Sequence, residues 1–500
     1  MSESAGRHEA RQRVIDALCA PELAPIVDLV VWADEDGEPY AANHLGSVRF
    51  RYQGGAEVLS GTNPLGSEDP MAFLPYQQEL ANPSPRVSTE NAYPLAWQRL
   101  RSFFADPERS PDLAIVHTPR HFFPDEGGHV GEHGSLDAIQ SRAPLIMSGA
   151  GVKKMGYVDA FARLVDVGPT LAFLAGVPAM DLVDANGQGL DGRVLRDHLE
   201  PGGGQRRHVI GMLWDGAHCG DLLHLAETGE LPGVARLIAN GLALRGGAVA
   251  EFPSITLTNH TSILTGTGPG RHGVMGNVYF DRATGERVVP NDQSTWHLSA
   301  DWLRPSARTI FEMVAKHAPG GDGTVRTASV DEAIDRGADY ATMALIRESG
   351  ESGADALDDA LPDPTTSPYL RDAAYLEDSY FRWGVRVDDF GITQMSALFS
   401  NPGSAPLLTW WASVVTDCGH HGGGPRSDMA RDALRQSDAR LVTFLDHLDS
   451  IGLSDQVTIL LTADHGFEGS DPEVIGSWKA ALDATGIPYR DEGPGLVYLL

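Results

Sequence analysis

Residues 252 to 260 read Phe-Pro-Ser-Ile-Thr-Leu-Thr-Asn-His and are the most informative stretch of this chain. It places the hydroxyl of Thr256 where an extended segment passes into a helix, and the amides at a helix N-terminus can hold a phosphate group. Two further segments follow it, His-Gly-Val-Met-Gly-Asn at 272–277 and Thr-Ala-Asp-His-Gly at 462–466. This combination predicts a site that handles phosphate.

Composition limits the classes of protein to which the chain can belong. Its 500 residues are 42% hydrophobic and carry a formal net charge of −30 at pH 7. This length allows one large or two medium domains with a real core, and the hydrophobic share is that of an ordinary globular protein. The acidity argues against sequence-independent nucleic-acid binding, which needs a surface rich in Lys and Arg.

The sequence contains no recognisable targeting or membrane-spanning segment. Its first residues lack the apolar run of a signal peptide, and no run of about 18 apolar residues predicts a membrane helix. Cys19, Cys219 and Cys418 are too few for a disulfide framework. We therefore expect a cytoplasmic protein without a membrane partner.

Apolar runs of strand length alternate with helical patterns along the chain. We predict strands at 26–32, 47–52, 113–117, 144–147, 209–214, 407–416 and 457–462, and an amphipathic helix at 427–448. Several of these runs are almost wholly apolar, which is typical of a parallel sheet covered on both faces. The alternation predicts an α/β fold, in which ligands bind beyond the carboxyl ends of the strands. Asp215, Asp417 and Asp464 each come just after such a strand.

The side chains at these strand ends have the chemistry of a two-metal phosphoryl-transfer site. Two divalent cations about 4 Å apart can neutralise phosphate oxygens, activate a nucleophile and stabilise a leaving group. The candidate ligands are Asp215, Asp417, His421, Asp464 and His465. Mixed Asp and His ligands favour zinc, with manganese or iron as alternatives. A metal bound to Thr256 would lower the pKa of its hydroxyl and make it a nucleophile.

These motifs resemble those of the type I phosphodiesterase/nucleotide pyrophosphatase branch of the alkaline phosphatase superfamily. The resemblance covers most of 206–282 and 407–470, and more loosely 110–195. It implies an alkaline-phosphatase-like fold, with Thr256 as the nucleophile. It also implies that Asn277 and the amide of Thr256 hold a phosphate oxygen. The ligands that it implies for the first metal are Asp215, Thr256, Asp464 and His465.

The second metal of this resemblance has a less regular set of ligands. The family signature Asp-x-x-Gly-His-x-x-Gly-Pro falls on 417–425, where His420 stands in place of the Gly. Either His420 or His421 could then be the ligand beside Asp417, and the spacing and the following Gly-Pro favour His421. The family also needs a further His well after Asp-His-Gly, and no His follows His465.

The missing His lies near the other end of the chain. Residues 131–136, 143–146, 164–171 and 174–178 resemble the C-terminal segment of the family. His133 within them would be the third ligand of the second metal, with His129 as a nearby alternative. This order predicts a circular permutation, which is tolerated where chain ends lie close together at the surface.

We therefore expect an α/β, alkaline-phosphatase-like core with a mostly parallel central sheet, in permuted order and with a cap. Its segments are 1–200 as the permuted C-terminal part of the core, 201–205 as a Gly-rich connector, 206–279 as the N-terminal part with the nucleophile, 280–405 as a cap insertion, and 406–500 as the core with the metal motifs. The tryptophans of the cap, like Asn259 and His260 next to the nucleophile, are expected to be packing residues.

The predicted function is hydrolysis of a phosphodiester or phosphoanhydride bond in a small phosphate ester such as a nucleotide. It would use two divalent ions, zinc before manganese, and a covalent phospho-threonine intermediate. The alternatives are a phosphomonoesterase or phosphonate hydrolase of the same superfamily, and a metal-binding protein without activity. No Arg immediately follows Thr256, and the neutral amide of Asn277 suits an oxygen that carries little charge. We therefore expect phosphodiesters to be preferred over phosphomonoesters. The sequence makes no prediction of oligomeric state.

Overall fold

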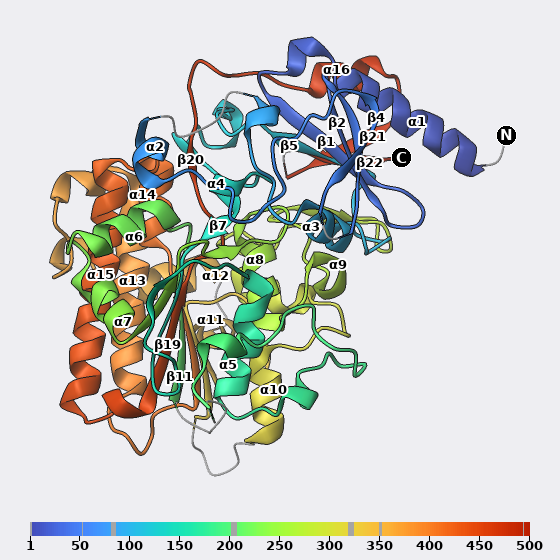
Figure 1. Cartoon of the computed structure of the whole chain (residues 1–500). Helices are drawn as coiled ribbons and strands as arrows, with labels where there is room; N and C mark the ends of the chain where they lie inside the picture. The colour runs from blue at the N-terminus through green and yellow to red at the C-terminus, as the bar shows by residue number, and fades with distance from the viewer. Residues whose placement is uncertain are drawn as a thin grey trace.

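The computed structural model describes residues 3–52, 54–81, 87–201, 208–318, 325–349, 353–493 and 495–500. Its two largest sheets are an eight-stranded sheet with helices on both faces and a seven-stranded sheet beside it (Figure 1). The Gly-rich part of the predicted connector, from 202 onward, lies outside the described residues.

The eight-stranded sheet forms the centre of the molecule. Its strands, in order across the sheet, are β17 (Tyr340–Ala341), β16 (Thr327–Val330), β18 (Leu408–Ser413), β11 (His208–Trp214), β19 (Val457–Thr462), β8 (Leu145–Gly149), β12 (Gly241–Leu244) and β9 (Gly156–Val158). All neighbouring strands run parallel except β8, which is antiparallel to β19 and to β12. This confirms the predicted α/β fold with a mostly parallel central sheet.

The three middle strands are apolar because helices cover both of their faces. Every residue of β18 and β19 is buried, as is every residue of β11 after its first. One face carries α5 (Val167–Leu174), α8 (Thr256–Thr265) and α10 (Ile310–His317); the other carries α7 (Pro232–Ala239), α13 (Ser379–Leu398), α14 (Val415–Gly423) and α15 (Asp428–Ser450) (Figure 1). Helix α15 is the amphipathic helix predicted at 427–448, and it buries one apolar side that includes Leu434 and Leu441.

The strand predicted at 407–416 ends earlier than its apolar pattern indicates. Strand β18 stops at Ser413, and helix α14 begins at Val415. The side chain of Asp388 accepts a hydrogen bond from the backbone N–H of Val414 at 2.8 Å. That N–H is then not available to a neighbouring strand, so the sheet ladder ends there and Asp417 lies in the first turn of a helix.

The second sheet is antiparallel throughout. Its order is β21 (Tyr489–Glu492), β22 (Leu496–Leu499), β5 (Leu113–His117), β1 (Val27–Ala33), β2 (Pro39–Asn43), β3 (Gly46–Phe50) and β4 (Ala56–Gly61). Helix α1 (Glu3–Leu18) covers it, and Val14 and Leu18 share a hydrophobic cluster with Val497 and Leu499. The N-terminal helix α1 therefore packs on the sheet that contains the C-terminal strand β22 (Figure 1).

The segment expected to form a cap contributes to the core as well. Strands β16 and β17 extend the central sheet beyond β18, and α10 and α13 pack on its two faces. The remainder includes the turns of helix at η7 (Trp296–Trp302), α11 (Thr342–Ser349) and α12 (Gly353–Ala360). Trp296 and Trp302 are half-buried and pack against the main hydrophobic cluster. Among the described helices, none combines the length and apolarity needed to cross a membrane.

Candidate active site

The central sheet brings three aspartates to one edge. Strands β18, β11 and β19 are parallel neighbours, with Trp214 opposite Ser413 and Leu213 opposite Thr462. Because the carboxyl ends of parallel strands meet at one edge of a sheet, the residues that follow them meet there too. These residues are Asp215 after β11, Asp417 in α14 and Asp464 after β19.

The predicted ligands form two overlapping groups. In one, the side chains of Asp215, Asp464 and His465 place one ligand atom each within 4.8 Å of the others; in the second, His133, Asp417 and His465 do the same. His421 adjoins the second group, with its Nε2 3.2 Å from His133 Nε2 and 3.5 Å from Asp417 Oδ1. The structure thus brings together six of the predicted residues, and their roles as ligands stay predictions.

The imidazole rings of this cluster are oriented in the same way. His421 Nδ1 is 2.9 Å from the carbonyl oxygen of Gly131, His133 Nδ1 is 3.2 Å from that of Ser254, and His465 Nδ1 is 3.1 Å from that of Gly466. A carbonyl oxygen can only accept a hydrogen bond, so each Nδ1 carries the hydrogen and each Nε2 presents its lone pair. This is the arrangement in which histidine binds a metal through Nε2.

Several buried polar atoms at this edge of the sheet have no hydrogen-bond partner within the described residues. They are Asp215 Oδ1, Asp417 Oδ1, Asp464 Oδ2 and His465 Nε2. Leaving such atoms buried and unpaired is costly, whereas carboxylate oxygens and neutral imidazole nitrogens are good ligands for zinc or manganese. The donor set therefore fits divalent cations.

The electrostatics of the cluster agree with a site built for positive charge. Burial and the nearby carboxylates of Asp464 and Asp417 raise the pKa of Asp215 well above its usual range. Burial, together with His465 and its other imidazole neighbours, lowers the pKa of His133 well below that of a free histidine. Burial, and after it the nearby His129, lowers the pKa of His421 well below that of a free histidine. Both imidazoles are neutral at pH 7, the form that can bind a metal.

His420, the alternative to His421, faces away from the cluster. Its Nδ1 lies 2.6 Å from the carbonyl oxygen of Thr416, and its Nε2 accepts a hydrogen bond from the backbone N–H of His218 at 3.4 Å. Its side chain is fully buried, and burial lowers its pKa to about 4. The geometry therefore favours His421 over His420 as the ligand beside Asp417.

His133 reaches the cluster from a distant part of the chain. The short strand β6 (Gly131–Glu132) pairs antiparallel with β20 (Glu468–Gly469), just after Asp464 and His465. A Cβ atom at Gly131 would lie 2.1 Å from the carbonyl oxygen of His420, so only glycine allows this close approach. The ring of His133 stacks on that of His465, with the two centroids 3.8 Å apart.

Thr256 occupies the first position of helix α8, as the sequence predicts. It is half-buried, and Ile255 is the extended residue before the helix. The carbonyl oxygen of Ser254 contacts His133, and His260, one turn along α8, faces Asp464. Because positions i and i+4 share a helix face, Thr256 lies on the side of α8 that faces the ligand cluster.

Asn277 lies at the same helix end. Its side-chain Oδ1 accepts a hydrogen bond from the backbone N–H of Leu257 at 3.2 Å. This contact directs the side-chain oxygen of Asn277 toward the start of α8, and its role in holding a phosphate oxygen stays a prediction. Asn259 is a packing residue, as expected, since its side chain bonds the backbone of Glu251 and Pro253.

Two contacts of this site were not predicted from the sequence. His260, expected only to pack, places its Nε2 3.6 Å from Asp464 Oδ2 and 3.8 Å from Asp215 Oδ2, while its Nδ1 is 2.9 Å from Glu332 Oε2. The spacing of four residues from Thr256 could have indicated this orientation. Tyr380, in α13, donates a hydrogen bond from its hydroxyl to Asp417 Oδ2 at 2.7 Å. No motif in the sequence points to Tyr380.

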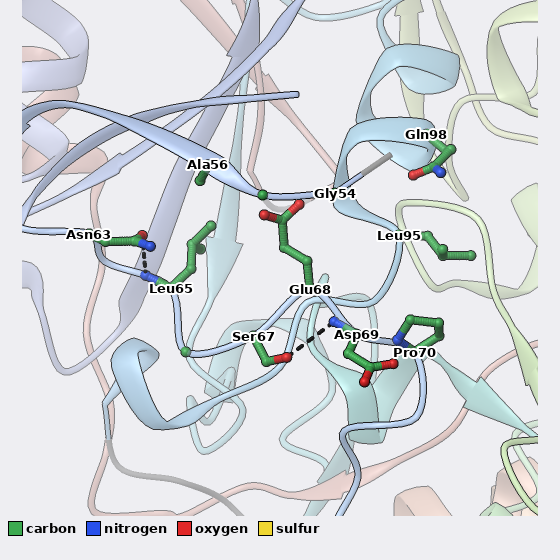
Figure 2. A pocket seen from close by; sticks show the side chains of 12 residues that line it. Gly54, Ala56, Asn63, Leu65, Ser67, Glu68, Asp69, Pro70, Leu95 and Gln98 are labelled. Carbon is green, nitrogen blue, oxygen red and sulfur yellow. Dashed lines mark hydrogen bonds between the residues drawn. The ribbon is translucent and has the colours of Figure 1, made fainter. Parts of the chain in front are cut away.

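A separate hollow of about 510 Å³ lies beside the antiparallel sheet. Glu68 extends into it toward the backbone near Gly54, and Leu95 and Gln98 line another side (Figure 2). Burial raises the pKa of Glu68 to about 7. None of the predicted ligands or the nucleophile lines this hollow, so the chemistry of the strand-end cluster, rather than the size of a cavity, locates the candidate active site.

Comparison with known proteins places most of the described core in one family. Residues 209–499 match the family model for type I phosphodiesterase / nucleotide pyrophosphatase. Over 87 residues the chain is 33% identical to alkaline phosphatase PafA of Elizabethkingia meningoseptica, a match that covers 17% of this chain and 14% of that protein. Over 53 residues it is 42% identical to an uncharacterized pyrophosphatase/phosphodiesterase of Schizosaccharomyces pombe, which covers 10% and 11% of the two proteins. These matches span only a small part of the length of these curated relatives.

Two solved structures are similar over about half of the chain. Murine ectonucleotide pyrophosphatase / phosphodiesterase 5 has 17% identity and a TM-score of 0.36, with 52% of this chain and 57% of that chain covered. Phosphonoacetate hydrolase from Sinorhizobium meliloti 1021, in complex with phosphonoformate, has 24% identity and a TM-score of 0.33, with 52% and 56% covered.

Proposed function

Because the chain belongs to the type I phosphodiesterase / nucleotide pyrophosphatase family, we propose that it hydrolyses a phosphodiester or phosphoanhydride bond at the Thr256 site. The substrate would be a small phosphate ester such as a nucleotide. The observation that carries this proposal is the convergence, near the start of α8, of unpartnered, buried ligand atoms from Asp215, Asp417, Asp464 and His465 in the described part of the chain. Bound divalent ions would pair with these atoms, whereas leaving the atoms buried without a partner would destabilise the folded protein.

Thr256 would act as the nucleophile. Its Oγ would attack phosphorus, so that an Oγ–P bond forms while the bond between phosphorus and the leaving oxygen breaks. The leaving oxygen keeps the electron pair and takes up a proton, and the hydroxyl proton of Thr256 passes to solvent. A water molecule then attacks phosphorus, the Oγ–P bond breaks, and Thr256 is protonated again. One water molecule is consumed for each bond that is cleaved.

The ligand clusters define what the metal would contribute. Asp215, Asp464 and His465 would hold the ion next to Thr256, and Asp417, His421 and His133 would hold the second ion, zinc or else manganese. When bound, such ions neutralise phosphate oxygens and lower the pKa of a neighbouring hydroxyl. The Nδ2 group of Asn277 and the N-terminal amides of α8 would orient the remaining phosphate oxygen.

The charge of the site supports a preference for diesters. Three carboxylates together with two divalent cations would carry a net charge of +1 before Thr256 loses its proton, and one monoanionic phosphodiester would neutralise that charge. The guanidinium of Arg426, the cation nearest in sequence to the His421 motif, is bound to the carboxylates of Glu79 and Glu468. Because these two carboxylates already neutralise Arg426, it adds little positive charge that could pair with the second negative charge of a phosphomonoester.

A comparison of two chromogenic substrates tests this proposal. We expect kcat/KM for bis(p-nitrophenyl) phosphate to exceed that for p-nitrophenyl phosphate, because this ratio reports differential binding of the two transition states. A chelator should abolish both activities, and zinc or manganese should restore them. A higher value for the monoester would assign the protein to the phosphomonoesterases, and turnover of phosphonates alone would assign it to the phosphonate hydrolases. No turnover of any of these by the metal-loaded protein would indicate a metal-binding protein without activity.

We further propose that the chain is a circular permutation of the family order, with 206–500 as the front of the fold and 1–200 as the back. In support of this, strand β8 belongs to the central sheet, α5 packs on β11, and His133 lies beside Asp417 and His465, although all three precede the family match at 209–499. The two ends of the chain also share one hydrophobic cluster. A chain that reads 206–500, a Gly/Ser linker and then 1–200 should fold and keep its activity. If this rearranged chain is insoluble or inactive with every linker length tested, the permutation is wrong.

A cytoplasmic location is also part of the proposal. Cys19, Cys219 and Cys418 are free thiols, and thiols persist in reducing compartments. Recovery of the native protein mainly outside the cytoplasm would contradict it.

A further inference from the structure

We infer that Tyr380 is a positioning residue for the second ion, because it selects which oxygen of Asp417 faces that ion. The inference rests on the proposed two-metal function and extends it to the segment at 280–405, whose sequence contains no recognisable motif. Tyr380 lies in the first turn of α13, in the part of the chain expected to form a cap.

The two oxygens of Asp417 have different surroundings. Oδ2 accepts the hydrogen bond from the Tyr380 hydroxyl at 2.7 Å. Oδ1 is buried without a hydrogen-bond partner in the described part of the chain and lies 3.5 Å from His421 Nε2. The oxygen that Tyr380 does not occupy is therefore the one directed at the histidines of the second group.

The hydroxyl of Tyr380 is held in place from two directions. Its ring stacks on that of Trp383, with centroids 5.7 Å apart and an angle of 4° between the planes, and Trp383 in turn packs against Trp296 at 5.3 Å. Helix α13 begins at the N-cap Asp378, whose side chain accepts a hydrogen bond from the backbone N–H of Phe381. The same helix packs along α14, which carries Asp417. The donor and its acceptor thus lie on two helices that are packed together.

This contact has a direct consequence for metal binding. A carboxylate with one oxygen fixed by a neutral donor offers the ion a single, preoriented oxygen. Without the donor, the carboxylate can rotate or chelate through both oxygens, and ordering it again reduces affinity. Removal of such a partner of a ligand typically costs about 10–100-fold in metal affinity.

The conservative variant Tyr380→Phe tests the inference, since it removes the hydroxyl and keeps the ring that stacks on Trp383. The metal-free protein is titrated with zinc against a chromophoric chelator, and circular dichroism checks the fold. We expect one of the two zinc affinities, that of the second ion, to fall about 10–100-fold while the other is unchanged. Excess zinc should restore kcat, which it would not do if the variant merely damaged the fold.

Tyr340→Phe is the matched control. The hydroxyl of Tyr340 belongs to the same segment and makes a hydrogen bond of the same length, 2.7 Å, but its acceptor is Oε1 of Gln394 rather than a predicted ligand. Both zinc affinities of this variant should equal those of the wild type. In the background Asp417→Ala, Tyr380→Phe should have no further effect on zinc affinity, because its acceptor is gone.

The outcomes separate this inference from the proposed function. If the wild type binds two zinc ions and Tyr380→Phe binds them equally well, the inference is wrong and the proposed function stands. An equal loss in Tyr340→Phe, or an unchanged loss in the Asp417→Ala background, would also overturn the inference. If the wild type binds no zinc or manganese, the proposed function fails and the inference fails with it.

Discussion

The two groups of predicted ligands are built in different ways. The first ion group, Asp215, Asp464 and His465, follows directly from β11 and β19, two paired strands of the central sheet, and all three side chains are almost fully buried. The second ion group, Asp417, His421 and His133, combines the helix α14 with a loop from the other end of the chain. The first group is fixed by the sheet itself, whereas the second depends on contacts between separate segments.

Those contacts come from several different segments of the chain. The loop that carries His133 is attached through the short pairing of β6 with β20, and the side chain of Glu468 in β20 is bound by Arg426. Tyr380 adds one hydrogen bond from a third segment. We therefore expect changes in the first group to remove function outright, and changes around the second group to weaken it by steps.

The largest effect is expected from Asp215→Asn in the first ion group. Its turnover should fall by roughly 10³-fold or more, since a ligand of the ion next to the nucleophile is lost. The metal-free variant should nevertheless melt about 2–4 °C higher than the metal-free wild type, because burial and neighbouring carboxylates make the charged form of Asp215 unfavourable in the fold. Thermal unfolding with and without chelator measures this. A lower melting temperature for the metal-free variant would contradict the inference that the charged form of Asp215 destabilises the metal-free fold.

A smaller and recoverable effect is expected from His133→Ala in the second ion group. Its zinc affinity should fall by roughly 100-fold, and excess zinc should restore part of the turnover, because two ligands remain. His129→Ala is the matched control, since His129 lies beside His421, with ring centroids 4.3 Å apart, but outside both groups of ligand atoms. Activity of His129→Ala should stay within about threefold of the wild type, on the scale of a surface substitution. The reverse pattern would show that His129 is the ligand.

The smallest effect is expected at a histidine outside both ion groups, where protonation changes the stability of the fold and not metal binding. His272 is fully buried beside Ser262, and burial and then Arg109 lower its pKa to about 3. In the unfolded chain the pKa of His272 is about 6.5, so below that pH the unfolded chain binds a proton that the folded chain does not bind. The contribution of His272 to stability is therefore present above pH 6.5 and is lost as the pH falls toward 3. Between pH 6.5 and 5.0 the metal-free wild type should lose about 1.6 kcal/mol of unfolding free energy that His272→Gln does not lose. Equal losses in urea unfolding of the two proteins would contradict this assignment.

The parts of the fold that follow from a local pattern could be predicted from the sequence. The apolar runs at 113–117 and 457–462 coincide with β5 and β19, because a strand buried on both faces leaves a continuous signal. The end of β18 could not be predicted, since a side chain from α13, Asp388, terminates it. The contribution of β16 to the central sheet was missed because its four residues carry too short an apolar run to be distinguished.

The same distinction holds for the site. Asp215, Asp464 and Thr256 lie inside motifs whose spacing reflects one strand end or one helix start. The structure brings Asp215 and Asp464 into one group and has Thr256 at the start of α8, while their roles stay predictions. Tyr380 is 37 residues away from Asp417, and its contact depends on how two helices pack. Contacts of this kind leave no periodicity or spacing in a single sequence.

We expect Thr256, next to the first ion group, to form a covalent bond to phosphorus during turnover. To test this, the zinc-loaded protein is mixed with bis(p-nitrophenyl) phosphate and quenched with acid within the first turnovers, and modified peptides are identified by mass spectrometry. We predict a burst of about one p-nitrophenolate per chain and an aryl phosphate on Thr256, both absent from Thr256→Ala, whose turnover should fall by roughly 10³-fold or more. An unmodified Thr256 together with retained turnover in Thr256→Ala would contradict the account.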